Sequence, residues 1–366
     1  MARKPEGELR RGWTTGACAT AATKAAYTAL LTGAFPDPVT IRLPKGQTPA
    51  FALAVEELGG GHAMAGVVKD AGDDPDVTHG CLVKATVAPG AAGSGVVFAA
   101  GDGVGTVTRE GLQIAAGEAA VNPVPRRMMS EAVQEVAAAH GGTGDVRIEL
   151  SIPGGAEIAK DTLNGRLGIL GGLSILGTTG VVIPYSCASW IHSIHRGIDV
   201  ARAAGVRHVA GSTGSTSEAA VKALYDLDDQ ALLDMGDFAG GLLKYLREHP
   251  VERLTIAGGF GKLAKLAQGH LDLHSGKSRV DTGFLAQVLA ELGAHDGVVG
   301  RARACDTGAQ VLAVARELGL PLADVVAARA AAVAQETAGD AVRVDVLIFD
   351  REGGQIGSSR AVPLGG

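Results

Sequence analysis

The spacing of apolar and polar positions divides the chain into two regions. In the first, short apolar runs separated by Gly, Pro, Asn and Asp predict strands at 39–44, 51–57, 62–70, 81–87, 95–101 and 146–153. Two helices accompany them, an alanine-rich one at 17–31 and another near 126–140. Turn residues between consecutive strands indicate hairpins, so residues 1–165 are predicted to form a mostly antiparallel α+β domain.

After about residue 165, strands alternate with helices. Apolar strands are predicted at 207–213 and 253–259, and helices at 187–204, 217–224, 238–248, 262–268, 283–292, 307–318 and 322–335. Such alternation is typical of a parallel sheet with helices on both faces, so 166–340 is predicted to be a Rossmann-like α/β domain. The tail at 342–359 has the pattern of a hairpin, and the sequence leaves open whether 341–366 joins the first domain's sheet.

Composition narrows the class of protein. Hydrophobic residues make up 46% and charged ones 20%, which is an ordinary globular composition. The formal net charge of −6 argues against nucleic-acid binding, although a local basic pocket can still bind a small anion. Four separated cysteines fit a reduced compartment and no zinc site. Without an apolar leader or a run of 18 apolar residues, we expect a soluble, cytoplasmic protein with no membrane partner.

The densest polar cluster is VKDAGDDPDVTHG at 68–80, which joins two predicted strands. Asp70, Asp73, Asp74 and Asp76 fall within seven positions, and His79 follows them. The acids do not have EF-hand spacing, and no HExxH frame occurs, so no metal site is predicted. Two interpretations stay open: a solvated turn rich in Asp, or a loop that carries chemistry.

Three glycine-rich turns follow apolar strands. GDGVGT at 101–106 either lets a nucleotide approach the backbone or is a tight turn that needs positive φ. GGFGK at 258–262 opens a helix whose amides can bind a carboxylate or phosphate, and Lys262 and Lys265 share a helix face. GSTGSTSE at 211–218 offers an anion or ribose cradle, although an ordinary helix cap explains it as well.

Two further groups of polar residues are candidates for ligand binding. Thr14 and Thr15 precede the alanine-rich helix, where they either cap it or help bind an anion, and Gly33 is expected to end that helix in the left-handed conformation. His270 and His274 lie four apart near Lys277 and Arg279, which favours hydrogen bonding to an acidic ligand over metal binding.

Six segments, in order over nearly the whole chain, resemble one family. They are RRGWTTGACATAATKAA, VKDAGDDPDVTHG, GDGVGTVTREGL, NPVPRRM, AKDTLNGRLGILGGLSILGTTGVVIPYS and AGGFGKLAKLAQGHLDLHSG. Together they look like the cobalt-precorrin-5B (C1)-methyltransferases of the anaerobic cobalamin pathway. The resemblance implies that S-adenosyl-L-methionine methylates C-1 of cobalt-precorrin-5B to give cobalt-precorrin-6A. The chain departs from the family pattern at Ser215, where a basic residue is expected, and at Gly155, where an acid is common.

The resemblance gives the candidate residues their expected roles. The tetrapyrrole carries many carboxylates, so cationic side chains and helix-start amides are expected to bind it. These substrate-binding candidates are Thr14, Thr15, Arg126, Arg127, Gly259, Gly261, Lys262, Lys265, His270 and His274. Asp70, Asp73 and Asp74 are expected to stabilise a cationic transition state, with His79 as proton acceptor. The methyl donor is expected at Gly101, Asp102, Gly103, Gly105 and Thr106, and the strand ends of the second domain stay open as an alternative donor site.

Two other functions stay open on the sequence. A nucleotide-dependent oxidoreductase would use GGFGK as its pyrophosphate turn, but the acid expected about 20 residues later is absent from the proper frame. A non-catalytic tetrapyrrole-binding protein would bind the substrate without the donor. Cobalt-precorrin-5B is the expected small-molecule partner, and homo-oligomerisation stays open.

Overall fold

The computed structural model describes residues 7–360 and divides into two compact units, Met1–Cys187 and Ala188–Gly366. The division lies 22 residues after the predicted boundary (187 − 165), because the glycine-broken segment after residue 165 pairs with elements of the first unit. Within the described part of the chain, none of the helices has the length and apolar character needed to cross a membrane.

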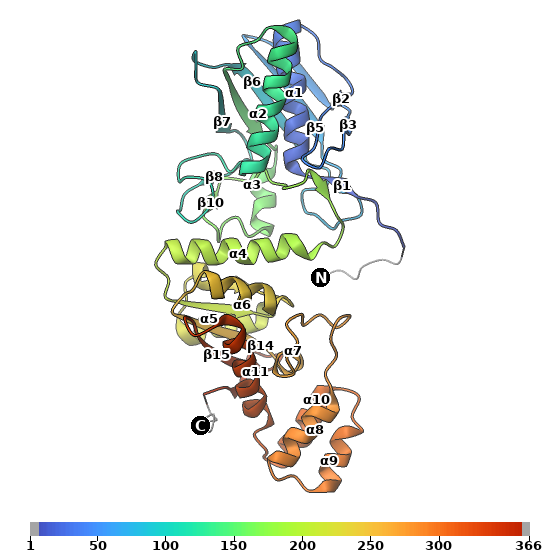
Figure 1. The fold of residues 1–366 in the computed structure, drawn as a ribbon, viewed down its shortest axis with the longest axis vertical. Coiled ribbons are helices and arrows are strands. Elements are labelled where there is room, and N and C mark those ends of the chain that lie inside the picture. The colour runs from blue at the N-terminus through green and yellow to red at the C-terminus, as the bar shows by residue number, and fades with distance from the viewer. Residues whose placement is uncertain (1–6, 361–366) are drawn as a thin grey trace. The chain divides into compact units, whose positions relative to one another are not determined.

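The first unit is built on a five-stranded sheet. Its order is β4 (Val55–Gly59), β5 (His62–Val68), β6 (Leu82–Pro89), β9 (Val146–Ser151) and β7 (Val96–Ala100). Only the β7–β9 pair is parallel, so the prediction of a mostly antiparallel sheet is confirmed. Helices α1 (Thr15–Thr32) and α2 (Pro123–His140) lie side by side against it (Figure 1).

The alanine-rich pattern explains why α1 lies at the centre of this unit. Its alanines are fully buried, and their small side chains let the helix approach both α2 and the sheet closely. The Thr14 side chain accepts a hydrogen bond from the Ala17 amide, and Gly33 (φ 81°) ends the helix in the left-handed region. Start and stop were both predicted from the sequence.

Short pairs of strands surround this sheet. They are β1 (Gly12–Trp13) with β11 (Val181–Val182), β2 (Val39–Thr40) with β3 (Ala50–Phe51), and β8 (Thr106–Val107) with β10 (Ile169–Leu170). The predicted strands at 39–44 and 51–57 are wrong in extent, since β2 and β3 pair over two residues each. Pro44 and Pro49 lack the amide hydrogens that a longer ladder needs. The short helix α3 (Gly155–Ile158) follows β9.

The second unit contains a sheet of order β13 (Leu232–Asp234), β12 (His208–Ser212), β14 (Arg253–Gly259), β15 (Arg343–Phe349) and β16 (Gln355–Ser358). Its first four strands are parallel and β16 is antiparallel to β15. The C-terminal hairpin therefore belongs to this sheet, and the option that it joins the first domain is wrong. Residues 361–366 of that option lie outside the described residues.

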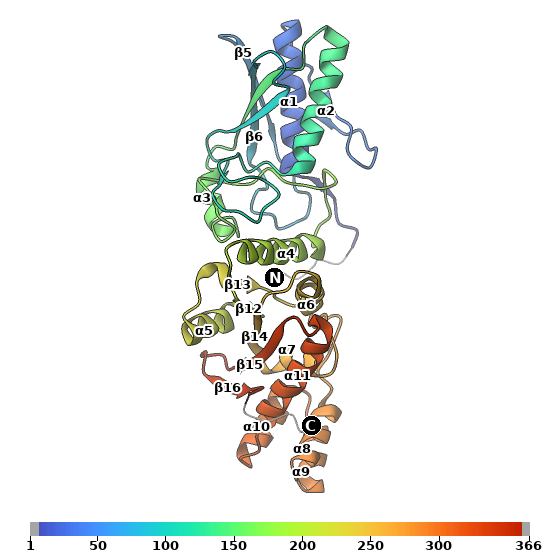
Figure 2. The same ribbon diagram turned by 60° about the vertical axis from the view of Figure 1, so that its left-hand side comes forward.

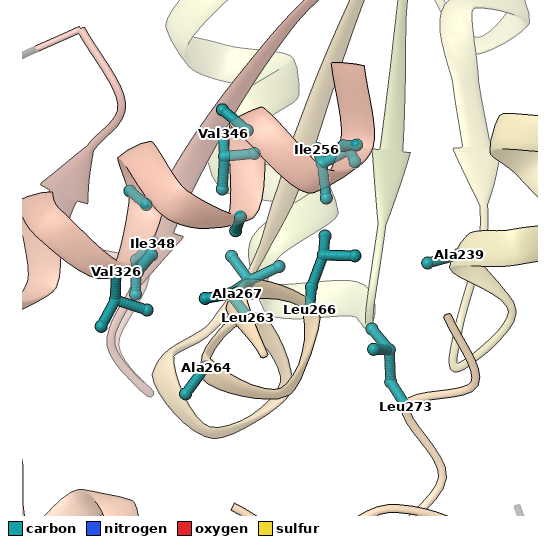
Figure 3. Packing of buried hydrophobic residues seen from close by; sticks show 14 of the residues in the cluster. Ala239, Ile256, Leu263, Ala264, Leu266, Ala267, Leu273, Val326, Val346 and Ile348 are labelled. Atoms are coloured by element: carbon teal, nitrogen blue, oxygen red, sulfur yellow. The ribbon is translucent and has the colours of Figure 1, made fainter. Parts of the chain in front are cut away.

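Side chains on the parallel strands alternate between two buried faces. Helix α5 (Ser215–Tyr225) covers one face (Figure 2). Helices α6 (Ala239–Glu248), α7 (Phe260–Ala267) and α11 (Leu322–Ala338) cover the other, with α4 (Cys187–Ala203) beside them. Figure 3 shows α7 side chains packed with Ile256, Val346 and Ile348 of the sheet. Burial on both faces is why these strands are mostly apolar, with Thr255 of β14 and Asp345 of β15 as buried polar exceptions.

Three more helices lie between α7 and α11 in the chain. They are α8 (Thr282–Glu291), α9 (Asp296–Arg303) and α10 (Gly308–Glu317), and they pack on one another (Figure 1). Helix α9 was not predicted, because its sequence DGVVGRAR contains two glycines and three charges in eight residues.

Candidate functional site

The acidic loop at 68–80 is fixed by contacts with the N-terminal segment. The Arg10 guanidinium binds both carboxylate oxygens of Asp70, with 2.9 Å between Nη2 and Oδ1. This hydrogen bond, the Gly72 amide and the Arg10 charge lower the pKa of Asp70 to about 2. The Arg10 amide donates to Asp73 Oδ2 (2.6 Å), so one residue holds two of the predicted catalytic acids.

Asp74 holds a different segment. Its Oδ1 accepts a hydrogen bond of 2.8 Å from the amide of Tyr185. Tyr185 has φ 57°, a conformation that costs energy for a residue with a Cβ. The carboxylate helps to stabilise this strained turn just after β11, so the loop joins the 10–13 and 181–185 segments of the first unit.

Lys69 and Asp76 form a buried ion pair inside the loop. Lys69 is 1% exposed, and its Nζ lies 2.6 Å from Asp76 Oδ2. Asp76 Oδ1 also accepts hydrogen bonds from the amide and hydroxyl of Thr78. Burial alone raises the pKa of Asp76, but the Lys69 charge and these hydrogen bonds outweigh it, so the pKa is lowered. Asp76 therefore stays ionised beside Lys69, and their contact fixes the loop.

His79 has a defined hydrogen-bonding state. Its Nδ1 accepts a hydrogen bond of 3.1 Å from the Ala71 amide, so the neutral ring carries its proton on Nε2. In that tautomer neither ring nitrogen is open to accept a proton, and the predicted role as proton acceptor requires loss of the Ala71 bond. The catalytic roles of Asp70, Asp73, Asp74 and His79 stay predictions, although every one of them has an intramolecular partner.

The glycines of the GDGVGT turn are explained by close packing of backbone segments. A Cβ on Gly101 would overlap Ser151, and one on Gly103 (φ 71°) would overlap the backbone oxygen of Ile152. A Cβ on Gly105 would lie 2.5 Å from Ile169 Cγ2. Asp102 accepts the Ile152 amide through its carbonyl, and Thr106 lies in β8. Close packing requires these glycines whether or not a ligand binds. Their presence is therefore no evidence for the predicted donor site in this turn.

Thr14, Thr15 and Arg126 act within the first unit. Thr14 caps α1, and the Thr15 hydroxyl accepts the Leu176 amide at 3.0 Å. Arg126 donates to the carbonyl oxygens of Val121 (2.8 Å) and Ala119 (3.1 Å). Its guanidinium therefore fixes the chain before α2, whereas Arg127 is exposed and lies 3.9 Å from Glu131.

The other substrate-binding candidates lie at the carboxyl edge of the second sheet. Gly259 ends β14, and Gly261 lies in the first turn of α7. Lys262 Nζ donates to the carbonyl oxygen of Thr213 (2.7 Å) and lies 3.1 Å from Asp237 Oδ1. Lys265 is buried, and its Nζ donates to the carbonyl oxygen of Leu273 (2.8 Å). Its ammonium therefore already has a hydrogen-bond partner within the protein. Burial lowers the pKa of Lys265 despite nearby Asp237.

The segment after α7 is mostly exposed and carries four basic side chains together with two acidic ones, Asp272 and Asp281. We call residues 269–281 the basic loop, with His270, His274, Lys277 and Arg279 as its basic side chains. Among the described residues, none of these four forms an ion pair within 4.0 Å. His274 Nδ1 accepts the Gly276 amide, so its neutral ring presents an Nε2 hydrogen to solvent. The basic loop can therefore donate to several carboxylates of one ligand.

One residue at this edge, Asp237, was missed from the sequence. It follows β13 and pairs with Lys262, whereas Ser212, which belongs to the predicted 211–218 cradle, ends β12. The sequence could have indicated Asp237, because it is an acid that follows an apolar strand and lies 23 positions after Gly214 (237 − 214). No group of three or more His, Cys, Asp or Glu side chains in residues 7–360 is arranged to hold a metal ion.

Comparison with known proteins gives consistent matches over most of the chain. The family model described as CbiD matches residues 2–184, and that described as CbiD, C-terminal domain, matches residues 272–360. A protein of Brucella anthropi named cobalt-precorrin-5B C(1)-methyltransferase is 62% identical over 349 residues, which cover 95% of each chain. Relatives of the same name from Brucella abortus strain S19 (62%) and Brucella melitensis biotype 2 (61%) cover 96% of each chain.

A solved structure is also similar. It is the crystal structure of the cobalamin biosynthesis protein cbiD from Archaeoglobus fulgidus, which is 29% identical. The match covers 70% of this chain and 78% of that chain, with a TM-score of 0.40.

Proposed function

Because the chain belongs to the CbiD family and is a methyltransferase of cobalamin biosynthesis, we propose that it methylates C-1 of cobalt-precorrin-5B with S-adenosyl-L-methionine as donor. The product is cobalt-precorrin-6A. The observation that carries the proposal is 62% identity over 95% of both chains to a relative named for this reaction. This identity supports the same reaction for this chain.

The reaction places simple demands on the protein. An electron pair of the ring carbon forms the new bond to the methyl group, and the pair of the broken bond to sulfur stays on the departing thioether. The positive charge of the sulfonium passes to the macrocycle. Such a displacement needs the carbon, methyl group and sulfur in line, so catalysis depends mainly on holding two ligands in fixed positions.

The basic loop is our proposed site for the substrate carboxylates. It offers two ring N–H groups, an ammonium and a guanidinium within ten residues, from His270 to Arg279. Its first part is anchored, because the Leu273 carbonyl accepts from Lys265 and the Leu271 carbonyl accepts from Gly240 (2.8 Å each). An anchored loop with exposed donors can orient a polycarboxylate at low entropic cost.

Methyl transfer by the whole protein tests the proposal. Incubation with cobalt-precorrin-5B and S-adenosyl-L-methionine is expected to add one methyl group, seen by mass spectrometry, and to release S-adenosylhomocysteine. A protein that binds the tetrapyrrole but never consumes the donor would be a carrier, and turnover of NAD instead would indicate an oxidoreductase. Either result overturns the proposal.

Variants of the basic loop test the substrate site. Lys277→Ala and Arg279→Ala should each raise KM for cobalt-precorrin-5B up to about fivefold, as expected for exposed charge pairs, with little change in kcat. Lys244→Ala on α6 removes one exposed positive charge elsewhere in the same unit and is the matched control. Equal KM values for all three variants and the parent protein would remove the basic loop from substrate binding.

A further inference from the structure

The strand order of the second unit reverses at β12. From β12 the chain passes through α5 to β13 on one side, and the next strand, β14, lies on the other side of β12. Helix α5 packs on one face of the sheet and α7 on the other. In open α/β sheets, ligands bind outside the carboxyl ends of the strands at such a reversal. The loops after β12 and β14 are therefore the place to search for a ligand site.

Ser212 is buried at this point without a partner. It is the last residue of β12 and is 1% exposed, and its Oγ has no hydrogen-bond partner among the described residues. A Cβ on the preceding Gly211 would point toward Leu242 of α6, so the Ser212 side chain faces the opposite side, which carries the α5 start. Burying an unpaired hydroxyl is unfavourable, and a polar ligand atom would satisfy it.

Two helices begin beside Ser212 without a side-chain cap. The N-cap residues are Gly214 for α5, whose first turn also contains Glu218, and Gly259 for α7, and neither helix has a side-chain hydrogen bond from its N-cap residue. A Cβ on Gly214, Gly259 or Gly261 would meet nothing within 4 Å, and Gly259 (φ −74°, ψ 153°) has angles open to any residue. Packing thus does not require glycine here, in contrast to the 101–105 turn. Uncapped amides without shielding side chains can hold a carboxylate.

The paired side chains of Lys262 and Asp237 also lie at the carboxyl edge of this sheet. Lys262 links the loops after β12 and β13 through Thr213 and Asp237, and the Gly236 amide donates to the Ser212 carbonyl (3.0 Å). The Asp237 side chain is 15% exposed, and its Oδ1 faces Lys262 without the alignment of a hydrogen bond. In nucleotide-binding sheets, an acid about 20 residues after the glycine turn binds the ribose hydroxyls. Asp237 follows the neighbouring strand at a similar separation.

We propose that this edge binds the S-adenosyl group of the methyl donor. The amides at the starts of α5 and α7, with Ser212 Oγ, bind the amino-acid carboxylate, and Asp237 binds the ribose hydroxyls. The assignment rests on the proposed function and moves the donor site away from residues 101–106. It also brings the donor next to the basic loop, since the Leu273 amide of that loop donates to the Asp237 carbonyl (2.8 Å).

Ser212→Ala separates a binding role from a structural one. Because Oγ has no partner in the protein, its removal should leave the midpoint of unfolding unchanged or raise it. If the ligand pairs with Oγ, the same change weakens S-adenosylhomocysteine binding by about two- to tenfold in calorimetry. Thr23→Val is the matched control, because Thr23 Oγ1 in α1 is likewise buried without a partner. It should leave the affinity unchanged.

Asp237→Asn and hydrogen exchange locate the ligand. The substitution keeps the shape and should weaken S-adenosylhomocysteine binding by about ten- to a hundredfold, as for hydrogen bonds to a charged group. In the parent protein, the ligand should slow amide exchange at 213–217 and 259–262. Protection confined to 101–106, or unchanged affinity of both variants, overturns this site while the proposed function stands. If the parent protein binds no S-adenosylhomocysteine, the proposed function fails and the site with it.

Discussion

The Lys69–Asp76 pair allows a quantitative test of how the acidic loop is held. The two partners differ in burial: Lys69 is 1% exposed and the Asp76 side chain 25%. They also differ in what remains when the other is removed. The Lys69 ammonium has no second partner among the hydrogen bonds and ion pairs of the described residues, whereas the Asp76 carboxylate keeps two hydrogen bonds from Thr78. The two single substitutions should therefore have unequal costs.

Asp76→Asn should be the more damaging change. It leaves the Lys69 ammonium buried without a counter-charge, and removing one partner of a buried pair costs about 3–5 kcal/mol. Lys69→Met keeps the chain length and leaves Asp76 partly exposed and hydrogen-bonded, so we expect about 1–2 kcal/mol. In the double variant the buried charge is gone, and its cost should approach that of Lys69→Met alone, well below the sum of the single costs.

The assay uses the two tryptophans, one in each unit. Trp13 packs against Phe51 in the first unit, with ring centroids 5.6 Å apart, and Trp190 lies in α4 of the second. In a Trp190→Phe background, fluorescence during urea denaturation reports on the first unit alone, which avoids treating two units as one transition. Equal costs for the two single variants, or additive costs in the double variant, would refute the reasoning.

Three further outcomes are expected from the first unit. Gly103→Ala should cost several kcal/mol in urea denaturation, because its Cβ overlaps a backbone oxygen and φ is positive; a cost near zero would contradict the packing argument. The contact with Arg10 lowers the pKa of Asp70 from 3.8 to about 2. Its contribution to the stability of the first unit is therefore present above pH 3.8 and is lost as the pH falls toward 2. Asp70→Asn should flatten the dependence of the unfolding free energy on pH over this range. Thr15→Val should cost about 1–3 kcal/mol by leaving the Leu176 amide unpaired, while calorimetry shows unchanged S-adenosylhomocysteine affinity.

The local signals in the sequence were sufficient for much of the fold. Thr14 and Gly33 at the ends of an alanine run predicted α1 within two residues, because cap chemistry is set by neighbours in the chain. Alternation of strands and helices predicted the parallel sheet, because each strand must be covered on both faces. The family resemblance, carried by six segments in order, predicted the reaction class, since the order and spacing of many motifs are properties of the chain itself.

The partner of each polar side chain was decided only by the tertiary structure. Arg10 and Asp70 are 60 positions apart, and Asp74 and Tyr185 are 111 apart, so no local pattern links them. The reason for each glycine was also decided by the tertiary structure. The glycines at 101–105 are needed because backbone segments distant in the chain pack closely there, whereas a Cβ on Gly259 would meet open space. The glycine-rich turns at 101–106 and 258–262 nevertheless look alike in the sequence. Sequence gives the chemistry that is present, but burial and hydrogen-bond partners depend on which remote segments meet, and these decide which acid is already occupied and which hydroxyl still lacks a partner.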